Sequence, residues 1–332
     1  MIAPTNAHGL EVGRYPGRED MQPEQVSQLI VINVETGNMN LLLESDDLVQ
    51  SPNWTSDDTW IVVNSLGKLW RVPADGSGPM QLIDTGDVCE INNDHVLSPD
   101  GKRVYFSAGS HPGTSLFSVD IGGGSVRRIS NEHPSEDNYS YFVHGVSYDD
   151  TLLAYTSVQP EGTDPRGRRN IVLIPTAGGE DIRLTEGASD NAYNGSEFSP
   201  DGEWIYYNSE EASVVKGHQQ IFRMHVDGTG REQLTFDDRV NWFPHLSPDG
   251  RQFVYQSYPA GVDSHPADMP IELRLLAVDG GEVRTVARLF GGQGTMNCNS
   301  WAPDGHRFAF IAYPSTREAL SLCSETDGEN PS

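Results

Sequence analysis

The turn tetrapeptide Ser-Pro-Asp-Gly recurs along the chain, and no other feature of the sequence constrains the fold as strongly. Six copies, three of them exact and three altered, begin at Thr55, Ser98, Ser147, Ser199, Ser247 and Ala302. Neighbouring copies lie 43 to 55 residues apart. Because each copy sits among short strand-like runs and further turns, the repeat predicts one four-stranded antiparallel sheet per copy, which is the blade of a β-propeller.

The fourth repeat illustrates the pattern. Its strand-like runs cover 194–198, 204–208, 220–225 and 232–234. Asp201-Gly202 supplies the tight turn between the first two runs, and the Asp-Gly-containing stretch 226–230 turns the chain between the last two. No amphipathic helix of useful length occurs in the chain, which argues against βα architectures.

The two ends of the chain indicate how the ring closes. The last repeat holds two strands, 297–302 and 307–313, and the chain starts with a hairpin, 28–34 and 39–43, that has no inner strands. We therefore predict an all-β, six-bladed β-propeller whose last blade is completed by the N-terminal hairpin, with two strands from each terminus. This closure removes free sheet edges. The predicted organisation is an N-terminal extension (1–25), the propeller (26–313) and a partly disordered C-terminal tail (314–332).

Composition limits the partners and the compartment. The chain has 48 Asp and Glu against 22 Lys and Arg, a net charge of -26, which argues against nucleic acid as a partner. An acidic, lysine-poor surface fits a salty habitat, and a codon bias for arginine explains it equally well. Three scattered cysteines argue against a disulfide framework. No run is long enough to span a membrane and residues 1–10 lack signal-peptide features, so we expect a cytoplasmic protein, or a periplasmic one if a leader was removed.

Strand direction predicts which loops share a face. Each inner strand should end at its Ser-Pro-Asp-Gly turn, so the insertions 108–114, 159–169, 209–219 and 258–270 should all lie on the face where the inner strands begin. The glycine-rich run 291–294 is interpreted as a flexible connector on that face. Seven of the ten histidines are predicted to lie there: His95, His111, His133, His144, His218, His245 and His265.

Counting back from the turns places polar and aromatic side chains around the mouth of the central channel. Three interpretations stay open. These side chains satisfy one another and channel waters, or they bind a polar ligand, or they hold a divalent metal such as Mn, Zn or Ca. The predicted ligand-binding residues are Asp94, Asn194, Asn241, Trp242, His245, Asn297, Asn299 and His265. The predicted metal ligands are His95, His144 and His245, and the predicted catalytic residues are His95, His144 and Glu197.

The repeats resemble those of TolB-type, WD40-like (PD40) propellers over about 26–313, through the Ser-Pro-Asp-Gly turns and the strand that follows each one. The mouth is also similar to that of oligogalacturonate lyases, propellers that hold a divalent metal through histidines at the channel. That resemblance implies a metal that neutralises a uronate carboxylate while a base removes the neighbouring proton.

These observations predict a propeller that binds a polar ligand, an oligosaccharide being the expected example, at the mouth of the channel. One alternative is a metal-assisted polysaccharide lyase or a glycoside hydrolase, with His95 or His144 as base, or Glu197 paired with Asp94 or Glu90. Another alternative is a protein-interaction scaffold. None of the three involves nucleic acid or insertion into a membrane.

Overall fold

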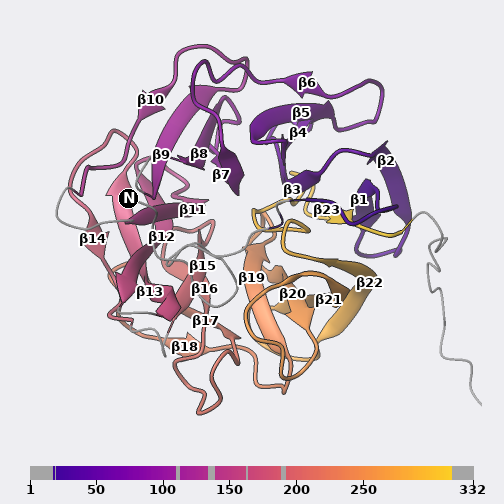
Figure 1. The fold of residues 1–332 in the computed structure, drawn as a ribbon. Helices are drawn as coiled ribbons and strands as arrows, with labels where there is room; N and C mark the ends of the chain where they lie inside the picture. The colour runs from indigo at the N-terminus through magenta and orange to yellow at the C-terminus, as the bar shows by residue number, and fades with distance from the viewer. Residues whose placement is uncertain are drawn as a thin grey trace, which may run out of the picture.

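Six β-sheets surround a common centre (Figure 1). The computed structural model describes residue 18 and residues 20–109, 113–133, 139–161, 164–187 and 192–315, without the side chains of 160–166. All regular structure in these ranges is β-strand, so the predicted six-bladed propeller is confirmed. Nothing in the same ranges forms a helix suited to crossing a bilayer. Most of the predicted extension and tail, together with His111, lies outside the described residues.

Blades one to five follow the chain, each starting with its inner strand. Blade one contains β3 (Val49–Trp54), β4 (Trp60–Ser65), β5 (Lys68–Pro73) and β6 (Gln81–Leu82). Blade two contains β7 (Ile91–Leu97), β8 (Arg103–Gly109), β9 (Thr114–Asp120) and β10 (Arg127–Arg128). Blade three contains β11 (Ser140–Val146), β12 (Leu152–Glu161), β13 (Asp164–Pro175) and β14 (Ile182–Arg183).

Blades four and five repeat the same order. Blade four contains β15 (Tyr193–Phe198), β16 (Trp204–Ser209), β17 (Gln220–His225) and β18 (Glu232–Gln233). Blade five contains β19 (Val240–Leu246), β20 (Gln252–Tyr258), β21 (Ala267–Ala277) and β22 (Arg284–Gly292). The predicted insertion 159–169 is largely strand, because β12 and β13 extend into a long hairpin there.

Blade six joins the two ends of the chain, as predicted. It contains β23 (Arg307–Ala312), β1 (Ser27–Asn33) and β2 (Met39–Ser45), and Leu29 pairs with both Ile311 and Leu43. The predicted inner strand 297–302 is not a regular strand, since it forms only one bridge, between Trp301 and Phe308. Its residues instead bond to other blades, as described below, and this blade therefore has three strands rather than two from each terminus.

The Ser-Pro-Asp-Gly turns are held by side chains as well as by the backbone. In blade two, the Ser98 hydroxyl donates to Asp100 Oδ1 over 2.7 Å and accepts from the Arg103 backbone N–H over 2.9 Å. The same carboxyl also accepts from the Lys102 backbone N–H. The pKa of Asp100 is lowered, and the hydrogen bond from Ser98 is the largest cause. The repeated motif is therefore a turn-forming device, as its residue types predict.

Replacing Ser98 by alanine should lower the free energy of unfolding by about 1 kcal/mol, because two hydrogen bonds are lost at a partly buried turn. Urea titration of the two proteins measures this. The sixth turn carries Ala302 naturally and is closed by Asp304 instead, so the variant should still fold. A loss of several kcal/mol would mean that the hydroxyl does more than close the turn.

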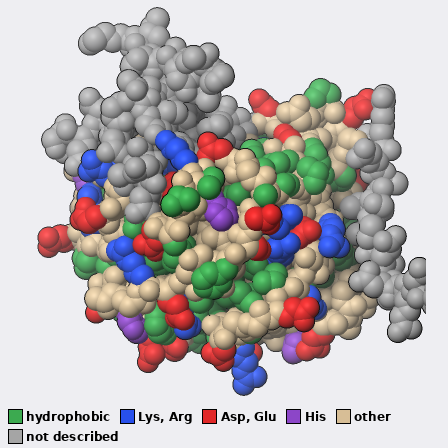
Figure 2. Space-filling view, turned by 90° about the horizontal axis from the view of Figure 1, so that it is seen from below, with side chains coloured by type: hydrophobic (Ala, Val, Ile, Leu, Met, Phe, Trp, Pro, Cys, Tyr) green, Lys and Arg blue, Asp and Glu red, His purple; other side chains and the backbone are tan. Residues whose placement is uncertain are grey.

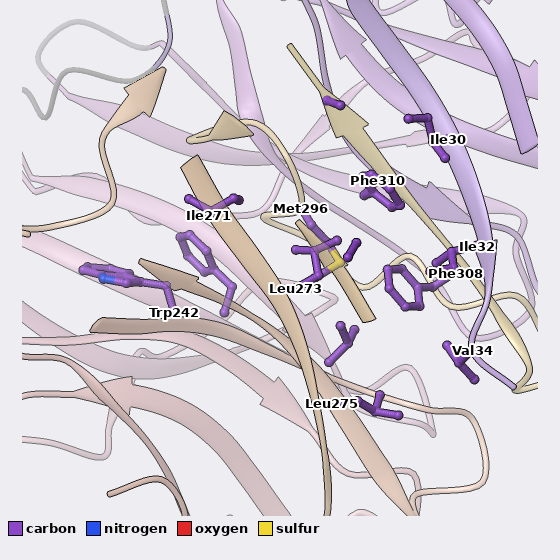
Figure 3. Packing of buried hydrophobic residues seen from close by; sticks show 14 of the residues in the cluster. Ile30, Ile32, Val34, Trp242, Ile271, Leu273, Leu275, Met296, Phe308 and Phe310 are labelled. Atoms are coloured by element: carbon purple, nitrogen blue, oxygen red, sulfur yellow. The ribbon is translucent and has the colours of Figure 1, made fainter. Parts of the chain in front are cut away.

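The hydrophobic core lies between neighbouring blades, and charged groups lie outside it. Figure 2 shows acidic side chains spread widely over the visible face. Between blades five and six, Phe308 and Phe310 of β23 pack in one cluster with Leu273 of β21 and with Met296 (Figure 3). Burial of such faces on both sides of each sheet stabilises the ring as a whole.

In blades one, two, four and five, the second strand carries a polar residue that bonds to an inner strand of the next blade or to Met296. This polar residue stands nine positions after the first residue of the turn. Asn64 Nδ2 donates to the Ile91 carbonyl over 2.8 Å, and Ser107 Oγ accepts from the Val143 N–H over 2.9 Å. Further links of this kind join Asn208 to Phe243 and Gln256 to Met296. Buried polar side chains thus fix the position of each of these blades relative to its neighbour.

Candidate functional site

The centre of the ring is occupied by residues 291–300, here called the central segment. Figure 1 shows this part of the chain, between β22 and β23, reaching inwards from the edge of blade five. Its carbonyl at Gly294 accepts from the Ser51 N–H over 2.7 Å, and Cys298 Sγ accepts from the His95 N–H over 3.3 Å. These bonds join it to the inner strands of blades one and two. The expected open channel is therefore closed in its interior, and the run 291–294 is buried rather than a loose surface connector.

Glu197 and His245 hold the central segment from the opposite side. Glu197 Oε2 lies 2.7 Å from His245 Nδ1, and Glu197 Oε1 accepts from Asn299 Nδ2 over 2.7 Å and from the Leu246 N–H over 2.8 Å. The other ring nitrogen of His245 lies 3.2 Å from the Met296 carbonyl. All of these groups are buried, so the predicted site residues Glu197, His245 and Asn299 come together, and their hydrogen bonds are used to fix the segment.

A second group of predicted site residues lies on the inner strands of blades two and three and contains Asp94, His95 and His144. Asp94 Oδ1 lies 4.0 Å from His144 Nδ1, and all three side chains are buried. Burial raises the pKa of Asp94 to about 7, and burial lowers the pKa of His95 to about 4 and that of His144 to about 3. Near pH 7 both imidazoles are therefore neutral, because charging them inside the protein is unfavourable.

The remaining predicted site residues have different environments. Trp242 is buried, and its ring meets His265 edge-on with centroids 4.2 Å apart. Asn297 bonds within the central segment, to Gln293 Oε1 and to the Gly294 N–H. Asn194 lies on β15, the inner strand of blade four, and its side chain is buried rather than exposed to solvent.

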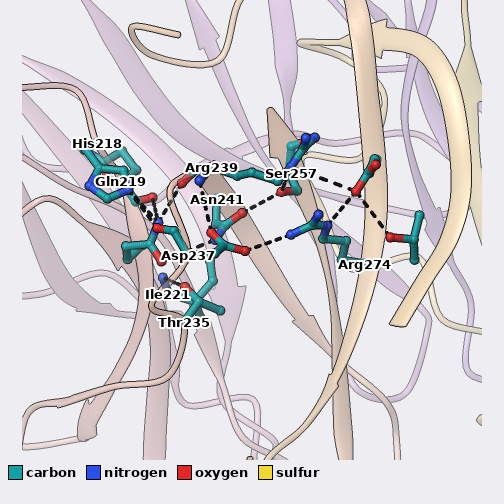
Figure 4. Close-up of polar contacts among 12 residues, drawn as sticks. His218, Gln219, Ile221, Thr235, Asp237, Arg239, Asn241, Ser257 and Arg274 are labelled. Carbon is teal, nitrogen blue, oxygen red and sulfur yellow. Dashed lines mark hydrogen bonds and ion pairs between the residues drawn. The ribbon is translucent and has the colours of Figure 1, made fainter. Parts of the chain in front are cut away.

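Asn241 belongs to a structural network between blades four and five (Figure 4). It donates to Asp237 Oδ1 over 3.0 Å and accepts from Ser257 Oγ over 2.7 Å. Arg274 extends the network to Asp237 and to Glu272, each at 2.7 Å. The polar groups of Asn241 are thus occupied within the protein, and nothing in the structure supports its predicted role in binding a ligand.

The predicted convergence of loops on one face is partly observed. A shallow pocket with little enclosed space is lined by Arg169, Gly217, Asp263 and Trp242, which brings together three of the predicted insertions. Two of the seven histidines bond to groups outside the central segment, His133 to Tyr141 and His218 to the Asp237 carbonyl. The histidines near the central segment are His95, His144 and His245, with His265 beside Trp242.

The side chains do not fit a metal ion. Among the residues that the structure describes, no group of three or more His, Cys, Asp or Glu is arranged to hold one. His144 lies 4.0 Å from Asp94 and His245 is engaged by Glu197, whereas His95 contacts Cys298 through its backbone N–H. We therefore derive no chemical step through a metal at this site.

Three inner strands share a bulge at the centre. Ser51, Gly195 and Phe243 stand at the same place in their repeats, four residues before the turn, and each has a positive φ between 51° and 63°. The strand register shifts at each of these places. Positive φ is unfavourable for Phe243, and strained backbone of this kind is found preferentially at functional sites.

Two residues that contact or form the central segment were not predicted as site residues. Cys298 stands at the bulge position of the sixth repeat, and its residue type gives no signal of a contact across the ring. Arg18 comes from the N-terminal extension, and its guanidinium bonds to Asp268 over 2.6 Å and to the carbonyls of Gly291 and Gln293. It also lies 3.6 Å from the ring centroid of Tyr313. The repeat pattern carries no signal for Arg18, because this residue precedes the first repeat.

Comparison with known proteins agrees with this architecture. A family model described as "TolB beta propeller domain" matches residues 162–330. The Agrobacterium fabrum protein Atu1656 is 36% identical over 288 residues, which cover 86% of this chain and 92% of that protein. The chain belongs to the TolB β-propeller family.

Two solved structures share the fold of this TolB-family chain. A TolB-like structure from Agrobacterium tumefaciens superposes with a TM-score of 0.78 at 34% identity, covering 87% of this chain and 98% of that one. An oligogalacturonate lyase in complex with manganese superposes with a TM-score of 0.52 at 14% identity, covering 81% and 74% of the two chains. The second likeness is one of fold alone.

Proposed function

We propose that this TolB-family propeller binds a polar ligand, of the oligosaccharide class, at the mouth of the ring above the central segment. The observation that carries the proposal is a set of buried polar atoms with no hydrogen-bond partner on five inner strands. They are Ser51 Oγ, both ring nitrogens of His95, His144 Nδ1, Asn194 Nδ2, Ser196 Oγ and Trp242 Nε1.

Buried polar atoms without partners are costly, and their recurrence on five inner strands supports a ligand that satisfies them. Sugar hydroxyls both donate and accept, which suits a set that mixes amide, indole, imidazole and hydroxyl groups. The rings of Trp242 and Phe243 lie beside this set, 5.5 Å apart between centroids, and add apolar surface of the kind found in ligand pockets.

The geometry supports binding more than catalysis. His95 and His144, the predicted bases, have pKa values of about 4 and about 3, far from the neutral values that make a general base effective. Glu197 is bound by His245, Asn299 and the Leu246 backbone, so it is not available as a catalytic carboxylate.

A lyase or hydrolase is the second candidate, and one observation favours it. Asp94 has a pKa raised to about 7 by burial, which suits proton transfer near neutral pH, and His144 lies 4.0 Å away. In that case Asp94 would replace the histidines as the base. Release of unsaturated or reducing ends from an oligosaccharide, lost in Asp94→Asn, would favour this candidate over simple binding.

Calorimetric titration of the full chain with separate series of neutral and uronate-containing oligosaccharides, each with and without EDTA, tests the proposed binding. We expect one series to bind at a single site, unaffected by EDTA. Trp242→Phe should weaken the binding of that series roughly tenfold, because an aromatic ring is kept while the indole N–H is lost.

Trp54→Phe is the matched control, because the Trp54 N–H donates to Asp58 in the turn at the opposite end of an inner strand. It should bind as tightly as the natural protein. If no series binds at millimolar concentration, or if both tryptophan variants bind equally, the proposed site is wrong. Binding abolished by EDTA would instead indicate a metal-dependent protein.

A further inference from the structure

The outer edge of blade six differs from those of blades one to four. Its outermost strand, β2, has seven residues, whereas β6, β10, β14 and β18 have two residues each. Among the described strands, none pairs with the outer side of β2. Proteins usually keep edge strands short, charged or covered, because their unpaired backbone groups recruit other strands.

The outer strand of blade five, β22, is also long, yet contacts at both of its ends hold it to other parts of the chain. The Phe290 carbonyl accepts from the Tyr313 N–H over 2.9 Å, and Arg18 Nη2 donates to the Gly291 carbonyl over 3.3 Å. At the other end, Arg284 Nη1 donates to the Val34 carbonyl over 2.6 Å. No comparable hydrogen bonds are found along the outer side of β2 in the described part of the chain, although the turn at Gly76 in blade one packs close to Leu42.

The side chains of β2 are mostly apolar, and its edge-protecting features are one charged residue, Glu44, and a shift in its register with β1. Met39, Leu41, Leu42 and Leu43 give the strand an apolar character, and Leu41 is 48% exposed. Leu42 and Leu43 pack against the core between blades six and one, which fixes the strand in place. The strand contains no lysine or proline, the residues that most often prevent edge pairing.

The surroundings of β2 are acidic. The stretch 35–47 contains Glu35, Glu44, Asp46 and Asp47, all exposed, and no lysine, arginine or histidine. His306, which lies outside this stretch, places its Nδ1 3.1 Å from a carboxylate oxygen of Glu35. A second copy of a chain with net charge -26 would be repelled, whereas a basic segment would be attracted.

We propose that β2 is a docking edge for an extended segment of a partner protein, in which apolar residues are flanked by lysines or arginines. The segment adds a strand to the sheet β2-β1-β23, so that its backbone pairs with the free side of β2. Its apolar side chains cover Leu41, and its basic residues meet Glu44, Asp46 and Asp47. This surface is separate from the proposed ligand site at the centre.

Fluorescence anisotropy with a labelled peptide, Lys-Lys-Val-Thr-Val-Thr-Val-Lys-Lys, tests the proposal on the full chain. We expect saturable binding that weakens as salt is added. The variant Glu44→Lys/Asp46→Lys/Asp47→Lys should bind roughly tenfold more weakly or worse, since three attractive contacts become repulsive. The matched control is Asp87→Lys/Glu132→Lys/Glu180→Lys, which makes the same change of charge at exposed positions on other blades and should bind nearly as the natural protein does.

Hydrogen exchange locates the bound peptide. The proposal expects new protection of backbone amides within 39–45 when the peptide is added, and loss of that protection in Leu41→Pro, which breaks the edge. Four results would overturn it. They are no binding to the natural protein, equal weakening in the two triple variants, protection that appears elsewhere, or self-association that protects 39–45 without peptide and so identifies a second copy as the occupant.

Discussion

Replacing Glu197 by alanine should lower the free energy of unfolding by about 3–5 kcal/mol. The carboxylate is buried and accepts from three groups: His245, Asn299 and the Leu246 backbone. Removing it leaves all three without their acceptor, and each lost partner of a buried group has its own cost. The variant also removes one of the two hydrogen bonds by which Asn299 Nδ2 ties the central segment to blades four and five, and the bond to the Leu246 carbonyl remains.

Urea unfolding monitored by tryptophan fluorescence measures this loss. Glu203→Ala is the matched control, because Glu203 lies in the same blade at an exposed turn, and we expect a change within about 0.5 kcal/mol. Glu197→Gln should lose less than the alanine variant, since an amide oxygen still accepts. Equal stability of Glu197→Ala and Glu203→Ala would show that the central segment is not held in this way.

Asp94→Asn should stabilise the protein at neutral and alkaline pH by up to about 4 kcal/mol. The pKa of Asp94 is about 7 in the folded protein because burial disfavours its charge, and about 3.9 in an unfolded chain. Below pH 4 the carboxyl is neutral in both states. As pH rises from 4 to 7 only the unfolded chain ionises, so the natural protein loses stability over that range and the asparagine variant does not.

The test is the difference in unfolding free energy between the two proteins from about pH 4 to pH 8. The burial of His95 and His144 lowers their pKa values, and both proteins lose the same stability as pH falls below 6.5 through those values. That effect cancels in the difference. A difference that stays constant with pH would contradict the raised pKa of Asp94.

The ring could be predicted from the sequence because its signals are local and repeated. A turn such as Ser98-Pro99-Asp100-Gly101 is recognisable by itself, and its spacing counts the blades. The pairing of β1 with β23 followed from counting strands at the two ends, since joining the two partial blades leaves fewer open edges that could recruit other chains. These inferences need no knowledge of which side chains meet.

The central segment could not be predicted, because its contacts join residues that are distant in the chain. Spacing from the turn placed 297–302 on an inner strand, as in every other repeat. Positive φ at Gly292 and Gly294, 107° and 90°, takes the chain out of the sheet instead. Cys298 then meets Asn93 and His95 on a blade two places away, and no periodicity in the sequence records such a contact.

The candidate site differs from the predicted one because of the same long-range contacts. His95, His144, His245, Glu197 and Asn299 were expected to face a channel, and all of them do lie at the centre. The hydrogen bonds of Glu197, His245 and Asn299 are used to hold the central segment, which leaves the unpaired atoms of the inner strands, those of His95 and His144 among them, for a ligand.

Reactivity of the Cys298 thiol tests the closed centre most directly. Cys298 is fully buried in the central segment, burial raises the pKa of its thiol, and a thiol reacts only when it is exposed and ionised. In a Cys89→Ser/Cys323→Ser variant, labelling by a maleimide should therefore be slow and limited by unfolding, and should become fast in urea. Rapid, complete labelling of the native protein would mean that the central segment does not fill the ring.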